Sequence, residues 1–234
     1  MDLTYRTSAC YDTIISVVVG KGEIKREFRL YKGLLSYHSS YFQAALNSRF
    51  AEGLYGVVHL PEDDVEVFQA FYYWLYTRKL FDLHAGRAYV SKTDTTNIEW
   101  MLICKIFVFG DARGIPGLKN AAADLIIAKF IQTWAFPIET VRFVFDNTQE
   151  SSPLRKLLVD MALESGDLDQ MRQYRGYFTK DFLVDMVVTM QKSNRVASVT
   201  SKEQWAARSL CIYHDHTNVL LFSGEVNTPG LLDL

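Results

Sequence analysis

Hydrophobic and polar positions in the first thirty residues predict a β-hairpin. Ile14 to Val19 is a run rich in β-branched residues, and Gly20-Lys21-Gly22 after it is typical of a turn. From Glu23 to Leu30 the character alternates, which places charged residues on one face and Ile24 and Phe28 on the other. We therefore expect the second strand to be buried on one face and solvated on the other.

After Lys32 the apolar spacing becomes helical, and the pattern predicts two short helices separated near Ser39-Ser40, where a serine can cap the second one. Val57 to Leu60 is a brief strand signal, and the acidic turn Pro61 to Asp64 predicts the start of a helix over Val65 to Tyr76. Further helices are expected over Trp100–Arg113, Ile115–Phe130, Ile138–Phe145, Leu154–Met161, Phe178–Gln191 and Ser201–Leu210.

Two parts of the chain lack a clear period. Residues Leu80 to Asn97 have no regular spacing and become polar at their end, so a long surface loop is expected there. Beyond Cys211 the sequence predicts a strand-like or irregular tail. The helix before that tail begins with a capping box formed by Ser201 and Gln204.

Composition narrows the class of protein. The chain has 234 residues, 49% of them hydrophobic, and its 25 basic and 27 acidic side chains give a formal charge of −2. This is an ordinary globular composition, large enough for one large domain or two modest ones. Near-zero charge without a dense block of Lys and Arg argues against direct contact with nucleic acid.

Cysteine usage and hydropathy indicate the compartment. Cys10, Cys104 and Cys211 are an odd number of cysteines at wide spacing, which argues against a disulfide scaffold and favours a cytoplasmic or nuclear protein. Residues Met1 to Tyr11 lack the apolar stretch of a signal peptide. No apolar run approaches the roughly 20 residues that cross a bilayer, so no membrane association is expected.

Several short motifs occur in an order that resembles the BTB/POZ domain. They span about residues 11 to 130 and are Tyr11-Asp12-Thr13, Phe28 to Leu35, Ser39-Ser40-Tyr41-Phe42, Phe68 to Leu80 and Gly110 to Ile115. Three positions depart from the family pattern: Tyr31 stands where a histidine is usual, Arg78 replaces a glycine, and Arg113 replaces an aromatic residue.

The resemblance implies an α+β fold, in which a small, mainly antiparallel sheet is flanked by helical hairpins. We expect a BTB/POZ domain over residues 1–131, with its core at 11–130 and a long loop at about 80–97. Residues 132–234 are expected to form a helical extension with an irregular tail. Within it, Arg142 to Asp160 is similar to the extension found in fungal BTB-domain proteins.

The resemblance also implies a binding role. Phe50-Ala51-Glu52 looks like the hydrophobic-x-Glu triplet with which BTB adaptors recruit a cullin-class ubiquitin ligase scaffold, so Phe50 and Glu52 are candidate partner-binding residues. The alternative is that Phe50 closes the domain's own core and Glu52 is a solvated charge. The predicted function is a substrate adaptor for a cullin ligase, with an unknown substrate as its second partner.

A self-association scaffold or a transcription-associated regulator without ligase binding is the alternative function. Asp12 and Lys32 resemble a charged pair near the interface of BTB homodimers, although they can equally be an ordinary strand-end aspartate and helix-start lysine. Only about ten residues precede Asp12, fewer than the segment that many family dimers exchange.

Enzymatic chemistry is not expected. Gly20-Lys21-Gly22 lacks the later glycines of a phosphate-binding loop, and His38, His59 and His84 accompany no nucleophile motif. We predict no cofactor.

The sequence contains one candidate metal site, formed by Cys211, His214 and His216. A structural zinc site needs a fourth ligand, which Asp215 or Cys10 would have to supply. The alternative is that these residues belong to a polar tail.

Overall fold

The computed structural model describes residues 8–47, 51–82, 87–88, 98–165, 168–193 and 201–216. The strands are β1 (Ile14–Val19), β2 (Arg26–Tyr31), β3 (Val57–Leu60), β4 (Phe81–Asp82) and β5 (Arg87–Ala88). The α-helices are α1 (Lys32–His38), α2 (Ser40–Asn47), α3 (Ala51–Tyr55), α4 (Val65–Thr77), α5 (Trp100–Ala112), α6 (Pro116–Thr133), α7 (Val141–Asn147), α8 (Pro153–Ser165), α9 (Leu168–Gln173), α10 (Lys180–Ser193) and α11 (Lys202–Ala206). The 3-10 helices are η1 (Ser8–Tyr11), η2 (Gly22–Ile24), η3 (Ile138–Thr140), η4 (Arg175–Tyr177) and η5 (Leu210–Tyr213).

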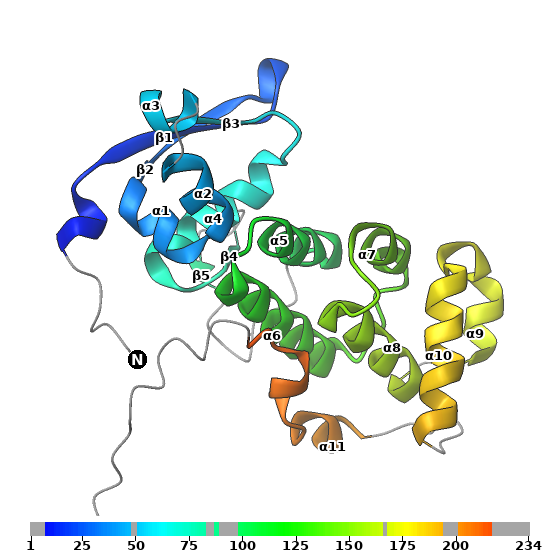
Figure 1. Ribbon diagram of the computed structural model, residues 1–234. Coiled ribbons are helices and arrows are strands. Elements are labelled where there is room, and N and C mark those ends of the chain that lie inside the picture. Colours follow the sequence, from blue (N-terminus) through cyan, green and yellow to red (C-terminus); the bar gives the residue numbers. More distant parts are fainter. Residues whose placement is uncertain are drawn as a thin grey trace, which may run out of the picture.

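The molecule is elongated in the order of the chain (Figure 1). The sheet with α1 to α4 forms one end, α5 and α6 lie in the middle, and α7 to α10 form the other end. Buried hydrophobic residues from Ile15 to Tyr213 nevertheless belong to one connected core. The two ends are therefore joined through packed side chains, which pass through the α5–α6 pair.

A mixed three-stranded sheet covers the first helices. Its strand order is β2-β1-β3, with β1 antiparallel to β2 and parallel to β3. Val17 lies opposite Phe28 on one side and Val58 on the other, and all three are buried. The parallel pairing of β1 with β3 requires a long connection, because parallel strands cannot be joined by a tight turn. The chain from β2 through α1 to α3 provides that connection.

The hairpin prediction is correct for the strands but wrong for Ile24. This side chain was expected on the buried face, yet it lies in η2 and is 74% exposed. Gly20 and Gly22 both have positive φ, at 77° and 63°, so the turn is longer than the alternating pattern indicates. The second strand consequently begins at Arg26.

Ser39 caps α2, as predicted, and also attaches the helix pair α1–α2 to the end of α5. Ser39 Oγ accepts a hydrogen bond from the Phe42 amide at 3.1 Å and donates one to the Arg113 carbonyl at 2.6 Å. Gly114 next to it has a φ of 57°, and a Cβ there would lie 2.1 Å from Ser40 Oγ. Only a glycine allows this approach without rearrangement.

Helix α4 begins where the acidic turn predicts. The Asp64 carboxylate accepts hydrogen bonds from the Glu66 amide and from Lys105 Nζ, both at 2.9 Å. Partial burial opposes ionisation, but these donors outweigh it and hold the Asp64 pKa below its usual value of 3.8. The buried side of α4 carries Phe68 and Phe71, whose rings meet edge to face at 5.5 Å.

The predicted helices after α4 are present, and α9 was not expected. The predicted surface loop at 80–97 begins with Leu80, which is buried, and contains the short pair β4–β5; residues 83–86 and 89–97 lie outside the described part. The predicted Ile138–Phe145 helix starts as η3 and continues as α7. Helices α7, α8 and α10 then pack together at the far end of the molecule (Figure 1).

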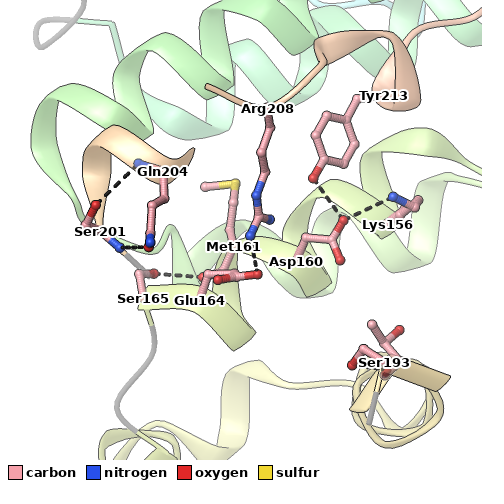
Figure 2. Close-up of polar contacts among 11 residues, drawn as sticks. Lys156, Asp160, Met161, Glu164, Ser165, Ser193, Ser201, Gln204, Arg208 and Tyr213 are labelled. Carbon is pink, nitrogen blue, oxygen red and sulfur yellow. Dashed lines mark hydrogen bonds and ion pairs between the residues drawn. The ribbon is translucent and has the colours of Figure 1, made fainter. Parts of the chain in front are cut away.

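Residues 201–216, here called the 201–216 segment, begin with the predicted helix, observed as the shorter α11, and continue through η5 to an irregular end at 214–216. The predicted capping box between Ser201 and Gln204 is present, and Trp205 is buried with its ring 5.0 Å from that of Phe130. Figure 2 shows how the segment is tied to α8: Arg208 pairs with Glu164 at 2.6 Å. Residues 217–234 lie outside the described part.

Candidate protein-interaction surface

Helix α3 presents two large apolar side chains to solvent. Leu54 is 72% exposed and Tyr55 is 79% exposed. Gly56 ends the helix with a φ of 66°; its amide donates to the Glu52 carbonyl at 3.0 Å, and its carbonyl accepts from the Ser16 amide at 2.9 Å. These bonds fix α3 to the start of β3, at an edge of the sheet (Figure 1).

Glu52 lies half-buried on the same helix, whereas Phe50 lies outside the described residues. We call Glu52, Leu54 and Tyr55 the α3 surface. Sequence reasoning missed Leu54 and Tyr55 because they belong to no element that the apolar spacing predicts. Their proximity to Glu52 along the chain was the one available signal.

Arg113, which departs from the family pattern, is used inside the domain. Its guanidinium forms an ion pair with Asp63 and lies 4.5 Å from the centroid of the Tyr41 ring. Its side chain is only 20% exposed. The charge is therefore compensated internally and is not offered to a partner.

Asp12 and Lys32 flank the open end of the β1–β2 hairpin, where the chain enters β1 and leaves β2. Asp12 is exposed and follows η1, while Lys32 is half-buried and starts α1. The Lys32 amide donates to the Thr13 carbonyl at 2.8 Å, so the strand end and the helix start are held together. Ile14, next to Asp12, is exposed.

The structure brings the metal candidates together. One ligand atom from each of Cys211, His214 and His216 lies within 4.8 Å of the others. His214 is half-buried, and the other two are exposed. Among the described residues, no further Cys, His, Asp or Glu joins this group, so neither Cys10 nor Asp215 completes it.

Two buried ionisable side chains, Cys104 and Lys119, have structural roles rather than chemical ones. Burial raises the pKa of the Cys104 thiol to about 12, which makes it an unreactive side chain at neutral pH. Lys119 lies 2.5 Å from Asp111 and 2.9 Å from Asp215. Burial opposes its charge, but the two carboxylates outweigh that effect and raise the Lys119 pKa. Lys119 thus stays a cation that links α5 to the 201–216 segment.

A cavity of about 770 Å³ lies between the hairpin turn and the start of α4. Three of its carboxylates are already paired: Glu62 lies 3.0 Å from Lys21, Asp64 lies 2.9 Å from Lys105, and Asp63 pairs with Arg113. Compensated charges at this cavity leave little attraction for a charged ligand. The α3 surface is the stronger candidate for binding, because large apolar side chains exposed together mark interaction sites.

These features define a protein-interaction module: a small sheet packed on helices, with exposed apolar side chains at one edge. The BTB/POZ domain family model matches residues 8–94, which contain the sheet and α1 to α4. This part of the chain is a BTB/POZ domain, and the predicted α+β fold class is confirmed. No curated protein matches the chain.

Two further findings bear on the sequence predictions. In the part of the chain that the structure describes, no helix has the length and apolar character needed to cross a membrane. The similarity of Arg142–Asp160 to a fungal extension and the domain boundary at 131 stay predictions.

Proposed function

We propose that this protein is a non-enzymatic adaptor, in which the BTB/POZ domain recruits a cullin-class ubiquitin ligase scaffold. The α3 surface supports this proposal. Leu54 and Tyr55 stand in solvent beside Glu52, on the helix that follows the Phe50 position. The proposed partners operate in the cytoplasm and the nucleus.

The chemistry of the α3 surface suits a protein partner. Burying the Tyr55 side chain in a partner pocket can supply a large part of the binding energy, because buried Tyr residues are frequent hot spots of interfaces, while a carboxylate beside it provides orientation. Phe50 is the predicted additional anchor.

The adaptor role needs a second binding surface for the substrate, and we assign it to the 132–234 extension. Helix α10 buries Phe182 and Met186, yet it also exposes Val184 and Val187 on another side. An exposed apolar ridge at the opposite end of the molecule from α3 allows two partners to bind at once (Figure 1).

We expect the full chain to bind a cullin amino-terminal domain with micromolar or tighter affinity. Replacing Phe50 and Glu52 together by alanine should weaken binding at least tenfold, as should Tyr55→Ala, because both changes remove anchoring area from the interface. Isothermal titration calorimetry with the purified proteins measures this directly.

Ile24→Ala is the matched control. Ile24 is as exposed as Leu54 and Tyr55, but it lies at the other end of β1 from α3. This variant should bind as the wild type does. Absence of binding at tens of micromolar, or binding indifferent to the Phe50/Glu52 double substitution and to Tyr55→Ala, contradicts the cullin proposal.

Self-association is the second candidate function, favoured by exposed Tyr11 and Ile14 beside Asp12 and Lys32. In that case multi-angle light scattering should give twice the chain mass. The dimer should dissociate at least tenfold more readily in Ile14→Asp, because a charge would be buried in an apolar contact. A strictly monomeric wild type removes this candidate.

A further inference from the structure

The Cys211, His214 and His216 side chains have a chemistry that the adaptor role does not use. A thiolate and two imidazoles are the donor set that favours zinc over magnesium or calcium, which prefer oxygen. Their ligand atoms lie within 4.8 Å of one another. Tetrahedral zinc, with bonds of about 2.0–2.3 Å, requires separations of roughly 3.5 Å. Rotation of the exposed Cys211 side chain can shorten the distances from its sulfur to both histidines.

Both histidines are hydrogen-bonded in a way that prepares them for a metal. His214 Nε2 lies 2.8 Å from the Asp124 carboxylate on α6, and His216 Nε2 lies 3.1 Å from the Cys211 carbonyl. A carbonyl can only accept, so His216 Nε2 carries the proton, and a carboxylate favours the same tautomer in His214. The lone pair of each neutral ring is then on Nδ1. An outer-shell acceptor of this kind typically orients zinc-binding histidines.

From this geometry we propose that Cys211, His214 and His216 bind one Zn²⁺ ion, with Asp124 as the positioning residue for His214. Cys211 releases its thiol proton to solvent when it binds the metal as a thiolate. The proposal is independent of the adaptor role, because no ligand belongs to the α3 surface.

Three protein ligands leave a fourth coordination position, which we assign to water. Asp215 does not fill it, because its carboxylate lies 2.9 Å from Lys119 Nζ and its amide donates to Asn120 at 2.8 Å. His214 and His216 line a cavity of about 670 Å³ together with Lys119 and the turn at 151–153. The open position thus has solvent access, unlike a closed structural site with four protein ligands.

The test uses the untagged full chain, stripped with a chelator and then dialysed against Zn²⁺. We expect one zinc per chain by elemental analysis. Competition with a chromophoric chelator should show at least tenfold weaker binding in Cys211→Ser and in His216→Ala, and about 10–100-fold weaker binding in Asp124→Ala. Co²⁺ in place of Zn²⁺ should give thiolate charge-transfer absorption that Cys211→Ser lacks.

Cys10→Ser is the control, since Cys10 is a partly exposed cysteine on η1, away from the 201–216 segment. It should bind zinc and cobalt as the wild type does. Circular dichroism of the metal-free variants separates lost ligation from lost folding. Absence of bound zinc in the dialysed wild type, or unchanged affinity and cobalt absorption in Cys211→Ser, overturns the proposal.

Discussion

Replacing Phe182 by alanine is expected to lower the free energy of unfolding by about 3–5 kcal/mol. Phe182 on α10 is fully buried, and its ring centroid lies 5.3 Å from that of Phe178, 5.5 Å from that of Phe145 and 6.1 Å from that of Phe136. These rings come from α10, the turn before it, α7 and the segment before η3. The alanine variant loses the transfer free energy of the ring and leaves a cavity that surrounding elements cannot fill by moving one side chain.

Leu183→Ala is the matched control for this prediction. Leu183 is the next residue on the same helix, but it is 45% exposed, so its truncation should change stability by no more than about 0.5 kcal/mol. Urea unfolding followed by circular dichroism measures both variants. Equal losses for the two would mean that α10 is not anchored through the aromatic cluster.

Elements with a complete local signal could be predicted from the sequence. Helix α4 combines an acidic N-cap at Asp64 with apolar residues such as Phe68 at helical spacing, and its observed start agrees with the prediction. The Ser201 capping box is equally local and is also confirmed. In these cases the residues that decide the structure are neighbours in the chain.

Features that depend on distant contacts could not be predicted. Helix α3 is only five residues long, and its end is fixed by the bond from the Ser16 amide to the Gly56 carbonyl. Ile24 fails for a local reason instead, because alternation of apolar and polar residues gives no information on the two positive φ angles before it. The buried Tyr213 likewise depends on α8, where its hydroxyl donates to Asp160 at 2.9 Å (Figure 2).

The residues of the candidate sites also differ in whether the local sequence could identify them. Phe50 and Glu52 could be named from a resemblance, whereas exposure of Leu54 and Tyr55 could not, because apolar residues are expected inside. For Cys211 and His214 the spacing was visible, but Asp124 lies far away in sequence. Arg155 shows the opposite arrangement: charged residues are usually exposed, but this one is buried.

Replacing Arg155 by methionine is expected to lower the free energy of unfolding by about 2–6 kcal/mol, because two carbonyl groups lose their donor at about 1–3 kcal/mol each. Arg155 on α8 is 6% exposed. Its Nη2 donates to the Phe145 carbonyl at 2.6 Å and to the Thr148 carbonyl, and Nε donates to Thr148 Oγ1 at 3.1 Å. The guanidinium thereby closes the C-terminal end of α7.

Two further substitutions test whether the forked geometry matters. Arg155→Lys keeps the charge but not the planar fork, so it should lie between wild type and Arg155→Met. Lys156→Ala removes a half-exposed pair with Asp160 at 3.1 Å and the contact of Nζ with the Tyr213 ring, 4.8 Å from its centroid, and should cost no more than about 1 kcal/mol. Thermal and urea unfolding of the three variants give the order. Arg155→Met as stable as the wild type would show that solvent satisfies the end of α7, and the α7–α8 contact would then depend on apolar packing alone.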